Sequence, residues 1–103
     1  MSTSLENLNA QLFHKHLRSK FKVQGTETII LELVDAVEGS TSPQMELFSV
    51  YFRGPFTPRL PQQIHYLEHE ELGVVEIFLT PVEADQEKGT TYESVFHRFR
   101  KSE

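Results

Sequence analysis

The order of apolar and polar residues divides the chain into one helical stretch followed by six stretches with the pattern of β-strands. Near the N-terminus, apolar residues recur at i, i+3, i+7 and i+8, the spacing of one helical face: Leu5, Leu8, Leu12 and Phe13. Thr3 and Glu6 have the spacing of a capping box, which would start the helix near Ser4. We therefore predict an amphipathic helix over residues 4–17, with its apolar side packed against the sheet.

Beyond the helix the period changes to two, which is the period of a β-strand. The clearest alternation is in residues 47–53, where Phe48, Val50 and Phe52 point to one face. The predicted strands cover residues 20–24, 27–37, 47–53, 62–69, 73–81 and 91–99. Because short links join them, we predict a mainly β fold in a single domain of residues 1–103. It would be a six-stranded antiparallel barrel-like sheet or a small sandwich with one N-terminal α-helix.

Several residues are predicted to bend or end these strands. The second strand is long, and we expect a bulge near Asp35 and Ala36. Residues 54–61 contain three prolines and a glycine, which favours a stiff loop because proline cannot donate to a strand ladder. Pro81 is predicted to end the fifth strand, and the polar residues 83–89 are predicted to form a loop.

Composition and charge narrow the classes of protein. Cysteine is absent, which excludes disulfides, thiol catalysis and thiolate metal sites. Fifteen acidic residues against ten Lys and Arg give a net charge of −5, which disfavours nucleic acid; residues 97–101 are a short basic exception. The N-terminus lacks the pattern of a secretory signal, and the apolar runs are far shorter than the roughly 20 residues that span a bilayer. We expect a cytoplasmic protein without a membrane, nucleic-acid or cofactor partner.

The candidates for chemistry are few. His65 and His69 share a strand face, but their spacing places them about 13 Å apart along a straight strand, too far to bind one metal ion. We expect His69 to bind backbone groups of the following turn. Glu68 shares a face with Ile64 and Tyr66, which would bury its carboxyl group; a salt bridge to Arg53 or Arg59 is the structural alternative. No nucleophile elbow, phosphate-binding glycine loop or dinucleotide fingerprint is present, and we predict no catalysis and no metal site.

Aromatic residues are more numerous than one small core requires. Either the helix, the curling of the sheet or another subunit must cover the remainder. We predict a protein-binding surface on the proline loop and the strand before it, made of Tyr51, Arg53, Phe56, Arg59 and Leu60. The predicted function is a non-catalytic protein-binding or assembly module whose partner is another protein or a second copy of the chain. The alternative is a small-ligand-binding or hydrolytic barrel with a site near His65, His69 and Glu68.

Six short motifs carry a resemblance: FRGP (52–55), LPQ (60–62), LEH (67–69), LG (72–73), EIFLTP (76–81) and YESVF (92–96). Over residues 12–99 the chain resembles an uncharacterised bacterial family of small β-rich proteins. Its pattern is F-x-G-P, L-P-Q-x-x-Y-x-L-E-H-x-x-L-G, E-x-F-L-x-P and Y-E-x-V-F. His65 stands at the tyrosine of that pattern, so no role is transferred to the tyrosine. The resemblance implies a bacterial domain of unknown function with an accessory or assembly role near phage-tail-collar-like fibre genes.

Overall fold

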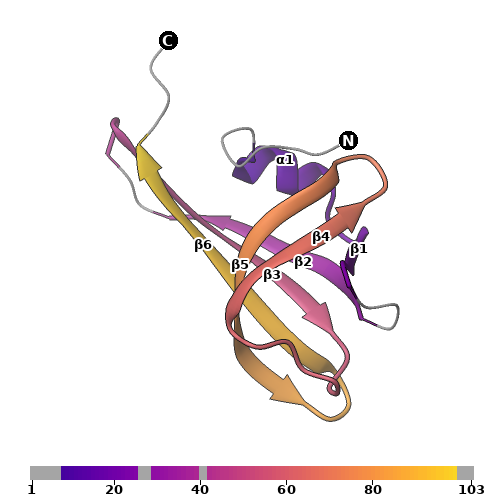
Figure 1. The fold of residues 1–103 in the computed structure, drawn as a ribbon. Helices are drawn as coiled ribbons and strands as arrows, with labels where there is room; N and C mark the ends of the chain where they lie inside the picture. The colour runs from indigo at the N-terminus through magenta and orange to yellow at the C-terminus, as the bar shows by residue number, and fades with distance from the viewer. Residues whose placement is uncertain (1–7, 26–28, 40–41, 100–103) are drawn as a thin grey trace.

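Six antiparallel strands form one closed sheet in the computed structural model, which describes residues 8–25, 29–39 and 42–99 (Figure 1). The strands are β1 (Lys20–Val23), β2 (Ile30–Glu38), β3 (Met45–Gly54), β4 (Gln63–His69), β5 (Gly73–Asp85) and β6 (Gly89–Phe99). Their order around the barrel is β1-β2-β3-β6-β5-β4, and β4 pairs with β1 to close the ring. The predicted mainly β fold, with six antiparallel strands and one N-terminal helix, is confirmed.

The core lies inside this ring and is formed by alternate residues of the strands. Phe48, Val50 and Phe52 are at most 1% exposed, as the alternation in β3 predicts. Phe21 of β1 packs edge-on against Phe52, with ring centroids 5.2 Å apart. Tyr92 of β6 is fully buried, and its hydroxyl accepts a hydrogen bond from the Leu60 backbone N–H at 2.9 Å.

The helix α1 (Ala10–Lys15) is shorter than the predicted 4–17. Asn9 is its N-cap, because the side-chain oxygen accepts the Leu12 backbone N–H at 2.8 Å. Leu8 therefore precedes the helix, although it is buried as the apolar stripe predicts. The predicted capping box lies outside the described residues. The described residues include no helix long and apolar enough to cross a membrane.

Two predictions about strand ends are wrong. The β-strand does not stop at Pro81: β5 continues to Asp85, and β6 begins at Gly89. Pro81 lies where the β5–β6 register shifts, between Pro81 and Glu83, and proline is tolerated at such an irregularity. Most of the predicted loop 83–89 is therefore a strand hairpin. In β2 the register shift lies between Leu33 and Asp35, close to the predicted bulge.

The two faces of β4 are the reverse of what the sequence indicated. His65, Leu67 and His69 point inward and are buried, whereas Ile64 and Tyr66 are 50% and 49% exposed. Both histidines form hydrogen bonds with polar groups inside the protein, and these bonds offset the free-energy cost of burying the rings. The apolar side chains of Ile64 and Tyr66 are left on the outer surface.

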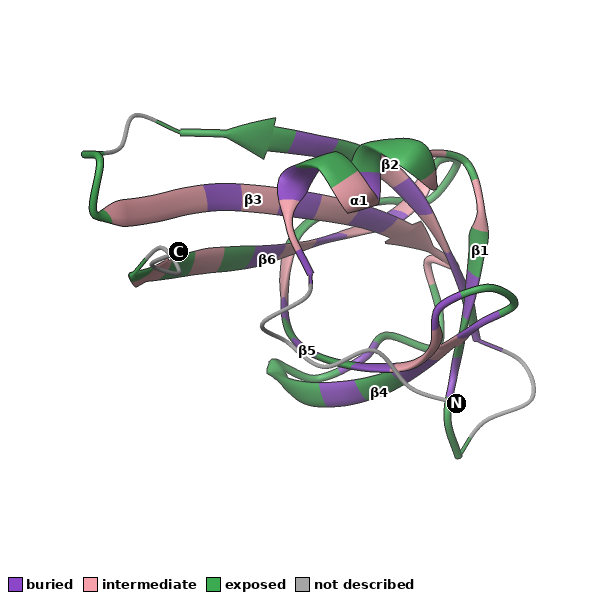
Figure 2. Ribbon diagram, turned by 90° about the horizontal axis from the view of Figure 1, so that it is seen from above, coloured by how far each residue is buried: buried purple, intermediate pink, exposed green. Residues whose placement is uncertain are grey.

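Three strands continue beyond the closed part of the barrel. Residues 36–38 of β2, 45–50 of β3 and 94–99 of β6 pair in register and form a projection that we call the arm. α1 lies across β2 and β3, and the three strands run past it side by side (Figure 2). The inner face of the arm is covered, since Phe13 of α1 lies 6.2 Å from Phe48 and 5.9 Å from Phe96 between ring centroids.

Candidate functional site

β5 and β6 are paired at one end and separate at the other. The hairpin pairs run from Asp85 opposite Gly89 to Thr80 opposite Glu93. Beyond them, residues 73–79 of β5 pair with β4, and residues 94–99 of β6 pair with β3. Among the described strands, neither segment has a second neighbour. We call this region the seam, and its two facing strand edges have no β-partner in the described part of the chain.

A groove of about 300 Å³ lies along the seam. Its lining is mainly apolar and comes from both strands and from β4: Ile64, Glu76, Ile77, Phe78, Ser94, Val95, Phe96, His97 and Arg98. Ile64 and Phe78 are direct register partners on the outer face, each about half exposed. Val95 on the opposite side is 57% exposed. The groove therefore combines unpaired strand edges with exposed apolar side chains, which is the composition of a peptide-binding edge.

Residues 94–99 keep regular pairing with β3 throughout. Their inner side is fixed by Phe96, whose ring stacks on Phe48 with centroids 4.6 Å apart and an interplanar angle of 5°. The Arg98 guanidinium lies over both rings and pairs with Glu46 at 3.0 Å. Arg98 also donates a hydrogen bond to the Leu8 carbonyl, linking β6 to the segment before α1. These contacts hold the edge of β6 in an extended, ready-made conformation.

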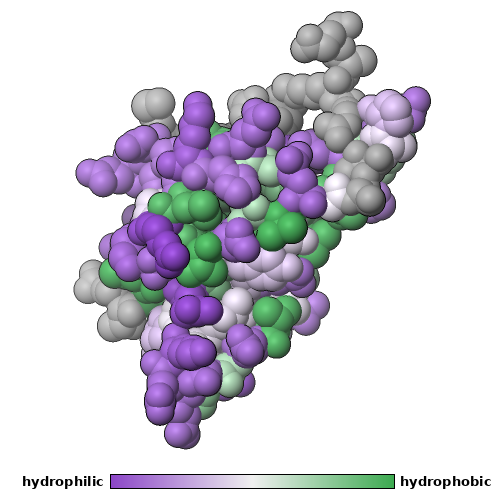
Figure 3. Space-filling view, turned by 180° about the vertical axis from the view of Figure 1, so that it is seen from behind, coloured by the Kyte–Doolittle hydropathy of each residue, from purple (hydrophilic) through white to green (hydrophobic). Residues whose placement is uncertain are grey.

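Figure 3 shows the surface of the molecule from the side opposite to the view in Figure 1. Its hydrophobic side chains form small areas separated by hydrophilic ones (Figure 3). Among the described residues, no large continuous hydrophobic patch is visible from this side. The unpaired strand edges at the seam are the more specific feature of the surface.

The predicted partner-binding residues are only partly brought together. Arg59 lies over the Phe56 ring, with 5.5 Å from the guanidinium carbon to the ring centroid; on the proline loop Arg59 is exposed and Phe56 is partly buried. Leu60 is 5% exposed and belongs to the core, so its inclusion in the contact surface is wrong. Its backbone N–H donates a hydrogen bond to the hydroxyl of the buried Tyr92, which holds Leu60 against the core.

Tyr51 and Arg53 lie on the outer face of β3, two residues apart. The Tyr51 hydroxyl donates to Glu93 at 2.8 Å, and this bond raises the pKa of Tyr51 above its ordinary value. Arg53 Nε is buried and has no hydrogen-bond partner among the described residues. The two side chains are therefore neighbours of the Phe56–Arg59 pair along the chain, but Tyr51 is already engaged within the sheet.

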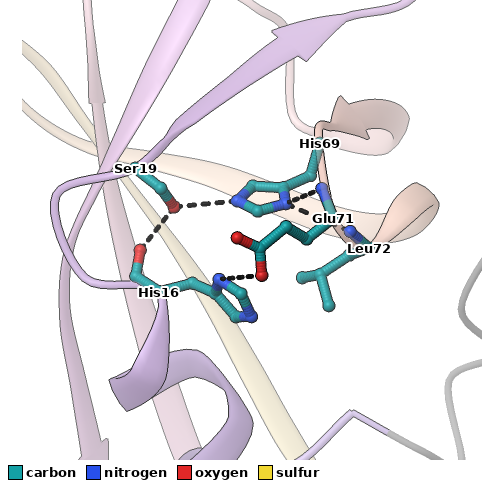
Figure 4. A network of polar contacts seen from close by, with 5 residues as sticks. All are labelled: His16, Ser19, His69, Glu71 and Leu72. Carbon is teal, nitrogen blue, oxygen red and sulfur yellow. Dashed lines mark hydrogen bonds and ion pairs between the residues drawn. The ribbon is translucent and has the colours of Figure 1, made fainter.

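His69 occupies the centre of a polar network that joins three segments (Figure 4). Its Nδ1 accepts the backbone N–H groups of Glu71 and Leu72, at 3.0 and 3.1 Å. The prediction that His69 binds the following turn is confirmed. Nε2 therefore carries the ring proton and donates to Ser19 Oγ at 3.0 Å, and Ser19 donates in turn to the His16 carbonyl.

This arrangement determines what His69 can do chemically. A base that activates Ser19 would need a free ring nitrogen facing its hydroxyl, whereas Nε2 already holds a proton there. Burial lowers the pKa of His69 below 6.5, and the nearby His16 lowers it further, while Glu71 and Glu70 oppose the change. Both ring nitrogens are thus used for structure.

The alternative site at His65, His69 and Glu68 is not assembled. The two histidines point inward, whereas Glu68 is on the other face of β4, opposite Lys22 of β1 and Val74 of β5. His65 Nε2 lies 2.8 Å from the Pro61 carbonyl and contacts that loop. The expected salt bridge from Glu68 to Arg53 or Arg59 is absent from the described residues. Among these residues, no group of three or more His, Asp or Glu side chains is placed to hold a metal ion.

The seam was missed from the sequence, although part of its signal was visible. The sequence has more aromatic residues than one small core requires, but Ile64, Phe78 and Val95 are not among the predicted contact residues. The available signal is that β6 has apolar residues on both faces in residues 95–99. A strand with apolar residues on both faces needs other residues to cover each face. Which face stays exposed depends on how the strand pairs with its neighbours.

The fold and seam define a small antiparallel β-barrel in which one strand edge has no β-neighbour among the described strands. A family model described as a domain of unknown function (DUF6916) matches residues 8–96, and the chain belongs to this family. Neither a curated protein nor a solved structure matches the chain.

Proposed function

We propose that this domain is a non-catalytic protein-binding or assembly module, and that its contact surface is the edge of β6 with the adjoining groove. One observation carries the proposal: residues 94–99 form a regular strand with no described β-neighbour on one side. An extended partner segment placed there would gain backbone hydrogen bonds from β6 and apolar contacts in the groove.

The chemistry of the edge supports binding more than protection. Natural edge strands are commonly shielded by lysine, proline or a bulge. Residues 94–99 have neither lysine nor proline, and the register with β3 is continuous across them; their one charged side chain, Arg98, is on the inner face and is paired with Glu46. Val95 and Phe99 instead present apolar side chains, 57% and 78% exposed. A cytoplasmic assembly role, including service to a phage-tail-like fibre protein, is consistent with this surface and is part of the proposal.

The proline loop is a second candidate surface for the same function. The partly buried Phe56 and the exposed Arg59 form a cation–π pair on a loop stiffened by prolines, and such a loop loses little conformational entropy on binding. Tyr51 and Arg53 precede it on β3. This surface lacks a strand edge without a described β-neighbour, and we rank it second.

Capture experiments with matched variants test the proposal. Tagged wild-type protein is compared with Val95→Arg, with Val82→Arg and with the double variant Phe56→Ala/Arg59→Glu in lysate of the source bacterium. Val82 is a suitable control because it is 49% exposed on β5 and lies outside the groove. Circular dichroism and urea unfolding first establish that all variants are folded.

We expect a specific protein to be retained by wild type, Val82→Arg and the loop variant, and to be lost from Val95→Arg. Loss from the loop variant alone would move the contact surface to residues 53–59. Equal capture by all four proteins, or capture of nothing by a wild-type protein that is also monomeric in solution, would contradict the proposed function at the seam.

A further inference from the structure

The end of β6 has a chemical pattern that is symmetric about His97. Val95 and Phe99 lie two residues on either side of it and share its outer face. Phe96 and Arg98 flank it on the inner face. Two such strands running antiparallel and centred on His97 would place Val95 opposite Phe99 of the second copy, and Phe99 opposite its Val95.

The inner face would be matched in the same way. In this register Phe96 faces Arg98 of the second copy, and a guanidinium group over an aromatic ring is a favourable contact. The chain already uses that contact internally, with Arg98 at 5.7 Å from the centroid of Phe96. The register therefore pairs the exposed Val95 and Phe99 on the outer face and is compatible with the inner face, where Phe96 and Arg98 already have partners in their own chain.

The charge distribution also favours a second copy at this edge. The chain has a net charge of −5, so most pairs of its surfaces repel one another. Residues 94–99 contain no acidic side chain, and Arg98 is paired with Glu46. Two paired segments 94–99 therefore place no carboxylates of their own opposite each other, and Glu76 is the acidic residue of the adjoining groove.

The position of the arm determines how two copies would be arranged. Residues 94–99 lie beyond the last β5–β6 pair, on the part of the sheet that runs past α1 (Figure 2). Antiparallel pairing of two arms places the two barrels at opposite ends of the shared sheet. The strand order across the interface would be β2-β3-β6 followed by β6-β3-β2 of the second copy.

From these observations we infer that the occupant of the β6 edge is a second copy of this chain, paired antiparallel with His97 at the two-fold axis. The inference rests on the proposed function, because it names the partner of the same edge. The dimer is isologous: each copy offers the same residues and receives the same residues.

The absence of cysteine allows a direct test of the register. A single cysteine in place of His97 would face its own copy across the axis, at a Cα separation of about 4.5–5.5 Å, which a disulfide can bridge. Purified His97→Cys, and an equimolar mixture of Val95→Cys and Phe99→Cys, are equilibrated in a glutathione redox buffer. Val82→Cys and Ile30→Cys, at 49% and 48% exposure, are the controls for random collision.

We expect His97→Cys to form a disulfide dimer at least tenfold faster than either control. The mixture should form mainly the mixed 95–99 disulfide. Sedimentation equilibrium of the cysteine-free protein should show a dimer that Val95→Arg weakens at least tenfold and that Val82→Arg leaves unchanged.

Three results would overturn the inference. A wild-type protein that is monomeric at all concentrations, with His97→Cys reacting no faster than the controls, excludes self-pairing. Preferential disulfides of Val95→Cys or Phe99→Cys with themselves exclude the register. Capture of a different protein that depends on Val95, from a chain that is monomeric alone, refutes the second copy while leaving the proposed function in place.

Discussion

At the scale of single residues, His69 links the hairpin after β4 to the segment after α1. Its ring holds the turn through two backbone N–H groups and holds Ser19 through a third hydrogen bond. It also packs against Phe21, with ring centroids 4.6 Å apart. A histidine used in this way is stable only in its neutral form, because a proton on Nδ1 would face two backbone donors.

This neutral form makes a pH dependence predictable. The pKa of His69 is lowered in the folded state, chiefly by burial, so the unfolded chain binds a proton more readily. The free energy of unfolding should therefore be largest above pH 7 and fall as the pH drops through about 6.5 toward the folded pKa. Urea denaturation between pH 8 and pH 5.5 measures this fall.

Substitution separates His69 from the other titrating groups. His69→Gln keeps a polar side chain that does not titrate, and the fall between pH 8 and pH 5.5 should be smaller in this variant. His14→Gln changes an exposed histidine and should leave the fall unchanged. An identical pH profile for wild type and His69→Gln would mean that His69 does not supply the dependence.

At the scale of elements, the β5–β6 hairpin determines where the seam begins. The Asp85 carboxylate accepts the backbone N–H groups of Glu87 and Lys88, at 2.8 and 3.0 Å, and these bonds lower the pKa of Asp85. Gly89 follows with φ of 101°, in the left-handed region. These local features start the pairing that ends at Thr80 opposite Glu93.

Gly89 gives a measurable test of this hairpin. A Cβ atom at position 89 would lie 2.1 Å from the Gly54 carbonyl oxygen, so Gly89→Ala requires the backbone to move. Gly25 also has positive φ, 87°, but a Cβ there would meet nothing within 4 Å. We expect Gly25→Ala to lower the free energy of unfolding by about 1–2 kcal/mol, and Gly89→Ala by clearly more.

Chemical denaturation of the two alanine variants beside wild type measures the difference. The pair is matched because both substitutions add the same methyl group at a left-handed position. Equal destabilisation would show that the contact between Gly89 and Gly54 does not constrain the hairpin.

The elements were predictable from the sequence to different degrees. Alternation in β3 identified Phe48, Val50 and Phe52 as core residues, because one face of a sheet is buried and its period is two. Alternation in β4 separated its residues correctly into two faces, but the inner face was assigned wrongly. Hydropathy favours Ile64 and Tyr66 for the interior, yet hydrogen bonds to Ser19, Pro61 and the turn bury the histidines instead.

Long-range pairing was the part that local pattern could not supply. The proline at position 81 indicated the end of a strand. In the structure Glu83 pairs with Thr91, so the strand continues beyond a register shift. The seam has the same origin. It exists because one segment of β5 pairs with β6 and the other with β4, and this pairing depends on residues far apart in the chain. The residues of the seam could therefore not be predicted from the sequence patterns, although the surplus of apolar residues in these strands was visible.

At the scale of the whole molecule, the barrel and the arm have different roles. The closed part of the barrel buries its core within a ring of six strands, with Leu31, Phe52 and Tyr92 fully enclosed. The arm has one face covered by α1 and one strand edge unpaired within the described residues. A module with a self-sufficient core and an incomplete sheet at one end is suited to assembly by strand addition.

The central claim is that the β6 edge, and not the proline loop, is the contact surface. Hydrogen–deuterium exchange tests it most directly, by comparing dilute isolated protein with the same protein in its assembled state, whether self-paired or bound to a captured protein. We predict slower exchange in residues 94–99 on assembly, and unchanged exchange in residues 53–60. Slower exchange confined to residues 53–60, with residues 94–99 unchanged, would contradict the account.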